Sequence, residues 1–147
     1  MAGTRSSPAP GDAAPDIALG ELGRLADYRT KRRVVLVLGP MDATDLKTLR
    51  ALDAAREHLD ALRTLAIAVG PGTTGAQAKR VARMGVKLPV KSDWTTMRQY
   101  GALGPLGLVA RRAVVVDGRG VVRLVMRGVA EVEKILVFLD ALRGDVE

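Results

Sequence analysis

The chain has 147 residues, a formal net charge of +7, 48% hydrophobic residues and no cysteine. Without a thiol there is neither a disulfide nor a thiolate nucleophile, which excludes thiol-based redox chemistry. No apolar run approaches the roughly 18 residues of a membrane-spanning helix, and the first ten residues lack the apolar stretch of a secretory signal. The composition therefore predicts a soluble, cytoplasmic protein that does not associate with a membrane.

The first 14 residues are rich in Pro, Ala, Gly and Ser and show no hydrophobic period, which predicts a flexible N-terminal tail over 1–14. The remainder, 15–147, is predicted to form a single domain. Four short runs rich in Val, Leu and Ile, bounded by Gly, Pro or charged residues, predict buried strands. These runs are 34–38, 64–69, 113–117 and 121–126.

An amphipathic helix is predicted between the first two strands, because apolar residues recur there at spacings of three and four. The residues of this stripe are Leu46, Leu49, Leu52, Ala55, Leu59 and Leu62. Thr44 or Asp45 is the predicted N-cap. A strand, a helix and a second strand in so few residues favour a right-handed unit with parallel strands.

Further helices are predicted at about 74–84 and 94–100, and a final helix carries Val132, Ile135, Leu136, Leu139 and Leu142 on one face. Between the last two predicted strands, 117–120 reads Asp-Gly-Arg-Gly, which is typical of a hairpin turn. Parallel and antiparallel strand pairs, with helices on both faces of the sheet, predict an α/β protein of the thioredoxin-like class with a central mixed β-sheet.

The loop after the first strand, residues 40–47, reads Pro-Met-Asp-Ala-Thr-Asp-Leu-Lys. It resembles the active-site loop of the peroxiredoxins, the alkyl hydroperoxide reductase and thiol-specific antioxidant family. That loop has a proline, three residues, a threonine, two residues and then the peroxidatic cysteine. Pro40, Thr44 and Lys47 fall on the three family positions, so the resemblance places Lys47 where the cysteine stands.

The resemblance extends from about Gly11 to Leu142 and implies a peroxiredoxin-type fold. Arg111, which precedes a β-branched run and the predicted turn, resembles the family's catalytic arginine. Gly39 departs from the family, which usually has an aromatic residue there, and this loss is expected to open the pocket wall. Leu52 stands where some members keep a resolving thiol. The resemblance implies no cofactor, and it implies a cysteine-less relative without thiol peroxidase activity.

The groups that remain at this site in the absence of the cysteine predict an anion-binding pocket. Lys47, Arg111, the Thr44 hydroxyl and the amides around 44–46 are the candidate groups for a carboxylate, phosphate or sulfate. The alternative is that Lys47 extends its ammonium into solvent and the site is inactive. An antioxidant enzyme that acts on peroxides by a non-cysteine route, for example through a deprotonated lysine, is a further alternative.

Basic clusters at 31–33 and 111–112 suggest the hypothesis that the chain binds nucleic acid. The positive charge is interpreted as spread along most of the chain among acidic residues, without a nucleic-acid motif, so specific nucleic-acid binding is not expected. Charge-driven binding of nucleic acid or an acidic partner stays an alternative. Because family members often dimerise, a homodimer is also predicted.

Two single residues complete the predictions. His58, the only histidine, is expected to face solvent rather than bind a metal, because no second histidine or cysteine accompanies it. Met41 is expected to be an exposed loop methionine.

Overall fold

The structure, a computed structural model, describes residues 7–72 and 74–147. Its centre is a five-stranded sheet in the order β3-β2-β1-β4-β5. The strands are β1 (Arg33–Leu38), β2 (Thr64–Gly70), β3 (Val90–Ser92), β4 (Arg112–Val116) and β5 (Val122–Arg127). β1, β2 and β3 run parallel, whereas β4 is antiparallel to both β1 and β5. The predicted mixed sheet is therefore confirmed.

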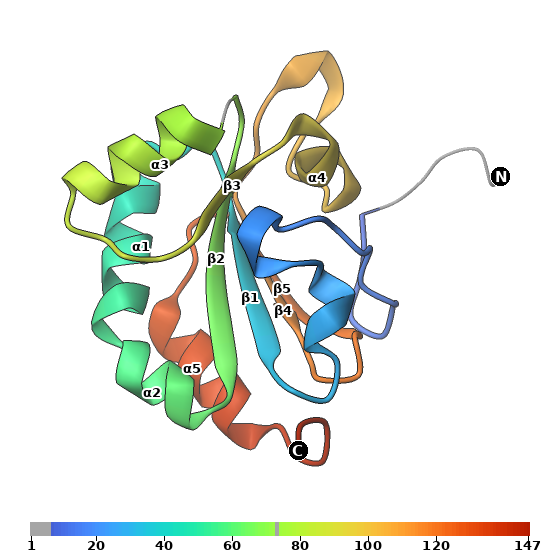
Figure 1. The fold of residues 1–147 in the computed structure, drawn as a ribbon. Helices are drawn as coiled ribbons and strands as arrows, with labels where there is room; N and C mark the ends of the chain where they lie inside the picture. The colour runs from blue at the N-terminus through green and yellow to red at the C-terminus, as the bar shows by residue number, and fades with distance from the viewer. Residues whose placement is uncertain (1–6, 73) are drawn as a thin grey trace, which may run out of the picture.

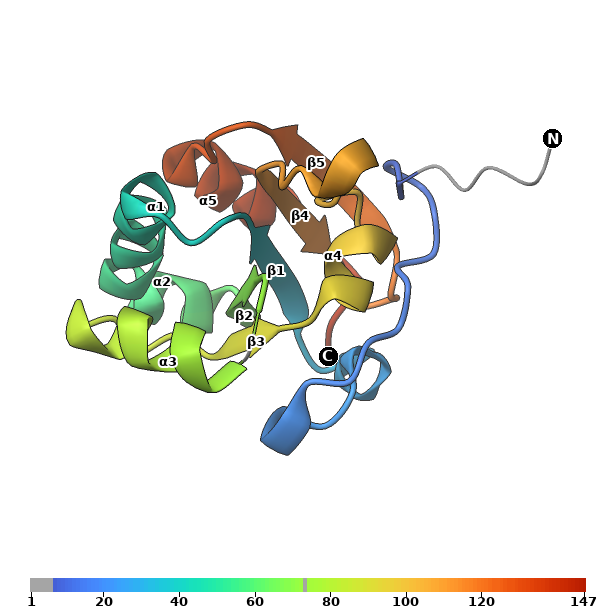
Figure 2. The same ribbon diagram turned by 90° about the horizontal axis from the view of Figure 1, so that it is seen from above.

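Helices cover both faces of the sheet (Figures 1 and 2). On one face lie α1 (Ala43–Ala54), α2 (Arg56–Ala61), α3 (Thr74–Arg83) and α5 (Val132–Ala141). The other face is covered by α4 (Trp94–Gln99) and by the N-terminal segment, which contains 3-10 turns at Gly20–Leu22 and Leu25–Tyr28. Within the described residues, no helix is both long and apolar enough to cross a membrane.

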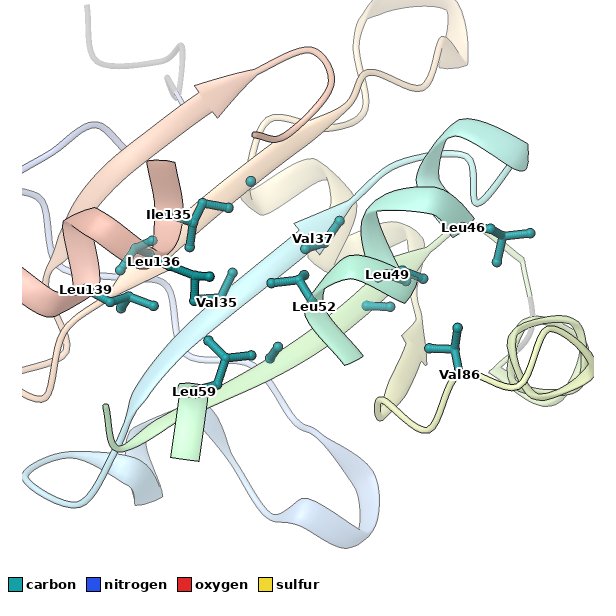
Figure 3. Close-up of a cluster of buried hydrophobic side chains, with 14 of the residues drawn as sticks. Val35, Val37, Leu46, Leu49, Leu52, Leu59, Val86, Ile135, Leu136 and Leu139 are labelled. Carbon is teal, nitrogen blue, oxygen red and sulfur yellow. The ribbon is translucent and has the colours of Figure 1, made fainter. Parts of the chain in front are cut away.

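Successive side chains of β1 point to opposite faces of the sheet and so divide the core into two layers. All six residues of the strand are buried. Val35 and Val37 belong to the layer under the helices of the first face, which Figure 3 shows. Labelled partners in this layer are Leu46, Leu49, Leu52, Leu59, Val86, Ile135, Leu136 and Leu139. Val34, Leu36 and Leu38 belong to the opposite layer with Met97 and Tyr100. The predicted apolar stripes of the first and last helices therefore face the sheet.

Part of the predicted flexible tail is paired with the sheet. Ala13 forms an antiparallel bridge with Val121, and the Gly11 N–H donates to the Val122 carbonyl over 2.7 Å. The ordered part of the chain therefore begins before residue 15, where the sequence predicted the end of the tail. Backbone hydrogen bonds hold residues 11–14, and composition does not reveal such bonds. The earlier part of that tail, 1–6, lies outside the described residues.

A buried ion pair joins the start of the central strand to the segment after α5. The Arg33 guanidinium contacts Asp145 through Nε at 2.9 Å and through its second terminal nitrogen at 2.7 Å. It also donates to the carbonyls of Leu62, Leu139 and Leu142. Asp145 accepts, in addition, the Gly118 N–H of the hairpin turn at 2.9 Å. Arg33 is therefore an internal cross-link and not part of a basic surface cluster.

The structure differs from the predicted elements in two further places. The predicted helix over 44–62 is broken at Ala55, whose ψ of 14° separates α1 from α2. The short edge strand β3 was not predicted, because its three half-buried residues show neither alternation nor a continuous apolar run.

Candidate functional site

The loop between β1 and α1 turns at Met41, whose φ of 59° lies in the left-handed region. The Met41 side chain is fully buried, and its N–H donates to Oδ2 of Asp45 over 2.9 Å. A bulky residue in this conformation costs about 1–3 kcal/mol, which the surrounding packing and this hydrogen bond must offset. The expectation of an exposed loop methionine is wrong, since the turn directs the side chain into the core.

Asp42 is the N-cap of α1. Its carboxylate accepts the N–H groups of Thr44 at 3.1 Å and Asp45 at 3.2 Å, and its carbonyl accepts the N–H of Leu46 at 3.0 Å. The predicted cap at Thr44 or Asp45 is therefore wrong by two or three residues. The amides that the sequence offered to an external anion are already bonded to Asp42.

Arg111 comes from the end of the segment that enters β4 and reaches across to the same carboxylates. Its Nε donates to Oδ1 of Asp45 over 3.2 Å, and a terminal nitrogen forms an ion pair with Asp42. The Asp45 side chain is only 5% exposed, against 29% for Arg111 and 45% for Asp42. One guanidinium thus faces two carboxylates at the N-terminus of α1.

The two carboxylates differ in their electrostatics. The hydrogen bond from Arg111 lowers the pKa of Asp42. Burial raises the pKa of Asp45, and although Arg111 acts against this shift, the neighbouring charge of Asp42 adds to it. The Asp42 bond likewise raises the pKa of Arg111. Charge in the cluster is therefore concentrated in the Asp42–Arg111 pair, with Asp45 the weaker acid.

Gly39 is explained by Asp45 rather than by an open pocket. A Cβ at position 39 would lie 2.7 Å from Oδ2 of Asp45, too close for any side chain. The expected opening of the pocket wall is thus absent at this point, because the Asp45 carboxylate fills the space. Gly39 and Asp45 form a matched pair, because any side chain at position 39, including the aromatic residue of the family, would require the Asp45 carboxylate to shift.

Lys47 and Thr44 lie in a groove between α1 and the segment that leads into α5. The groove has a volume of about 510 Å³. Its α1 side consists of Thr44, Lys47, Thr48, Ala51 and Ala55, and its other side of Val129, Ala130, Val132, Glu133 and Leu136. Lys47 is exposed and has no ion-pair partner among residues 7–72 and 74–147. Arg111 does not line this groove.

The structure thus brings together only part of the predicted site. Thr44 and Lys47 share the groove, whereas Arg111 is bonded to Asp42 and Asp45. Pro40 is a half-buried residue of the loop. Anion binding by Thr44, Lys47 and Arg111 stays a prediction, and it requires that the anion displace Asp42 from the guanidinium.

Sequence reasoning did not identify Asp42 and Asp45 as the partners of Arg111. An Asp directly before a helical pattern is a recognised N-cap signal, so Asp42 was within reach of the sequence. The contact of Arg111 with Asp45 was not, because it joins residues 66 positions apart. His58 is exposed, as expected. The described residues contain no group of three His, Cys, Asp or Glu side chains that could hold a metal ion.

Comparison with known proteins decides the family. The model of the AhpC/TSA family matches residues 10–125. The chain belongs to the AhpC/TSA family. No curated protein matches it.

Solved peroxiredoxin structures share the AhpC/TSA fold seen here. Peroxidoxin BcpB from Mycobacterium tuberculosis superimposes with a TM-score of 0.81 at 24% identity, over 93% of this chain and 99% of that one. The mitochondrial 2-Cys peroxiredoxin from Plasmodium falciparum gives a TM-score of 0.73 at 13% identity, over 90% of this chain and 93% of that one. The reduced 2-Cys peroxiredoxin from Plasmodium vivax gives a TM-score of 0.70 at 19% identity, over 90% of this chain and 80% of that one. The predicted thioredoxin-like, peroxiredoxin-type fold is confirmed, for a chain without cysteine.

Proposed function

We propose that this chain is a cysteine-less AhpC/TSA protein in which Lys47 replaces the peroxidatic cysteine, without thiol peroxidase activity. It acts by binding a ligand or partner and not by turnover. The chain has no residue that can cycle through sulfenic acid and disulfide. A lysine ammonium has no free electron pair and is not a nucleophile.

The ion pairs of Arg111 are the observation that carries this proposal. If this arginine corresponds to the catalytic arginine of peroxiredoxins, its role there requires a guanidinium that is free to hold peroxide oxygens. Here Asp42 and Asp45 occupy it, and they leave little net positive charge at that position. The chain therefore lacks not only the thiol of a peroxiredoxin but also the free positive charge beside the position of that thiol.

Peroxide consumption tests this proposal. Wild type, Lys47→Cys and Lys47→Cys with Asp42→Asn are compared with hydrogen peroxide and an organic hydroperoxide, with dithiothreitol as reductant. Wild type is expected to be inactive, the single variant slow and the double variant faster, because Asp42→Asn removes one of the two carboxylates that hold Arg111. Turnover by metal-free wild type would overturn the proposal in favour of an oxidoreductase with a non-cysteine route.

The ligand of this proposal is a small anion held by Thr44, Lys47 and Arg111, in exchange for Asp42. Calorimetric titration with phosphate and sulfate tests it. Asp42→Asn should tighten binding, because the competing carboxylate is gone while an Asn cap remains. Lys47→Ala should weaken binding. Heats that are the same for wild type and both variants would remove the anion from the proposal and leave a partner protein.

A cytoplasmic location and a homodimer are parts of the same proposal that rest on composition and on family resemblance. Sedimentation at several protein concentrations tests the dimer. A single monomeric species up to the highest soluble concentration would contradict it.

A further inference from the structure

The positive charge of the chain is concentrated in one segment. Residues 61–92 contain six cations and no acid, whereas the rest of the chain has 17 cations and 16 acids. The six are Arg63, Lys79, Arg80, Arg83, Lys87 and Lys91. The interpretation that the charge is spread along most of the chain is therefore wrong for this segment, which accounts for +6 of the net +7.

Four unpaired cations of this region and of α1 form what we call the α3 patch. It consists of Lys79, Arg80 and Arg83 of α3 together with Arg50 of α1, and all four are exposed. Arg50 is placed beside α3 by a contact of its guanidinium with the Met84 sulfur at 3.8 Å. Figures 1 and 2 show α3 at the periphery of the molecule.

The four neighbouring cations of the α3 patch share one feature, the lack of an acidic partner within the described residues. In the described residues, none of its four members has an ion pair. Elsewhere, Arg24, Arg32, Arg33, Arg56, Lys91, Arg111, Arg123 and Lys134 each pair with an acid. Lys87 is left out of the patch, because it shares a shallow hollow with Asp53 and Glu57.

Stability of the fold does not account for this arrangement. Lys79 and Arg83 are four residues apart on one helix, where like charges destabilise by about 0.2–0.5 kcal/mol. The dipole of α3 favours cations in its last turn and offsets part of that cost. It gives no reason for Arg50, which approaches from the middle of α1. An external polyanion would stabilise all four charges together.

The surroundings of the patch narrow the choice of polyanion. Val81, on the inner side of α3, is 1% exposed, so its side chain is used by the core and is not free to enter a bilayer. Met84, an exposed hydrophobic residue directly after α3, is contacted by Arg50, so cations and not apolar anchors characterise this part of the described surface. From Lys79 to Arg83 the helix rises about 6 Å, which is close to two steps of about 3.4 Å per phosphate along one DNA strand.

We propose that the α3 patch binds the phosphate backbone of nucleic acid without reading its sequence. Four cations against phosphates predict binding that is weak at physiological salt and steeply salt-dependent. No aromatic side chain belongs to the patch, so stacking on bases contributes nothing to recognition. This surface is independent of Lys47 and Arg111, and it accords with the expectation that sequence-specific binding is absent.

Fluorescence anisotropy with a labelled duplex of mixed sequence tests the proposal. The plot of log K against log salt should have a slope of about −3.6 if four phosphates are neutralised, which is a loss of about 150-fold between 50 and 200 mM salt. Arg80→Ala with Arg83→Ala should reduce the slope by about 1.8. Both are exposed helical positions where alanine favours the helix, so the fold is retained.

A matched control removes two cations elsewhere. Lys31 and Arg119 are exposed and lack an ion pair in the described part of the chain, and they flank the other end of the sheet. Lys31→Ala with Arg119→Ala should leave the slope unchanged. Equal loss in both double variants would show diffuse attraction and overturn the proposal, as would absence of binding at 50 mM salt. Binding to vesicles containing phosphatidylserine but not to the duplex would replace nucleic acid by a membrane surface.

Discussion

Asp42 has two roles at one position, as the cap of α1 and as the partner of Arg111, and substitution can separate them. Asp42→Ala removes the cap and should destabilise the protein by about 1 kcal/mol. Asp42→Asn keeps a capping oxygen but loses the charge, so most of that stability should remain. Urea unfolding of both variants measures the difference. Equal destabilisation would mean that the ion pair, and not the cap, stabilises this helix end.

Asp145 gives a prediction for the dependence of stability on pH. Its hydrogen bonds with Arg33 lower its pKa from 3.8 to about 2. As the pH falls, the unfolded chain therefore takes up this proton first. The resulting stability is complete above about pH 4 and is lost as the pH falls towards 2, with a magnitude of about 2 kcal/mol.

Asp145→Asn isolates that contribution. The variant leaves the buried Arg33 without its counter-charge, which should cost about 3–5 kcal/mol at pH 7. Because wild type itself loses the charge on acidification, the gap between the two unfolding free energies should shrink by about 2 kcal/mol between pH 7 and pH 2. A gap that stays constant over this range would contradict the assigned pKa.

Residue-level prediction from the sequence failed where partners are distant in the chain. Arg33 was grouped with its basic neighbours, although its carboxylate partner is 112 residues away. Arg111 was correctly singled out, but the carboxylates that occupy it were not. Hydrophobic period and local motifs report on neighbours within a few residues, so neither could reveal these contacts.

At the scale of the elements, the sequence predicted the strands well because buried strands have a simple signature. Observed bounds differ by at most two residues from the predicted runs 34–38, 64–69, 113–117 and 121–126. The sequence did not predict the break at Ala55, because the apolar stripe continues at helical spacing through it. The paired segment at 11–14 has a composition typical of disorder, but backbone hydrogen bonds join it to residues 120–122.

The two sides of α5 differ in their tolerance to substitution. Leu139 is fully buried, whereas Val137 on the same helix is 70% exposed. Leu139→Ala should lower the free energy of unfolding by about 2–5 kcal/mol through lost burial and a cavity. Val137→Ala should change it by less than about 0.5 kcal/mol. Chemical denaturation of both variants is the measurement, and a large effect at Val137 would point to a covered surface in solution.

For the whole molecule, the strand order predicts a gradient of protection from hydrogen exchange. β1 lies in the centre of the sheet and is buried throughout, while β3 is a three-residue edge strand that pairs only with β2. Amides of Arg33–Leu38 should exchange slowest, and those of Val90–Ser92 fastest among the strands. Exchange followed by mass spectrometry tests this order, which would be contradicted by a protected β3 in the isolated protein.

The pairing of Arg33 with Asp145 also constrains the moment at which the chain can fold during synthesis. A nascent chain that has emerged only as far as α5 holds all five strands, but the Arg33 guanidinium at the start of β1 then lacks its counter-charge. The neutralising carboxylate arrives only with residue 145. During synthesis, we therefore expect the full stability of the fold only when nearly this whole sequence has emerged.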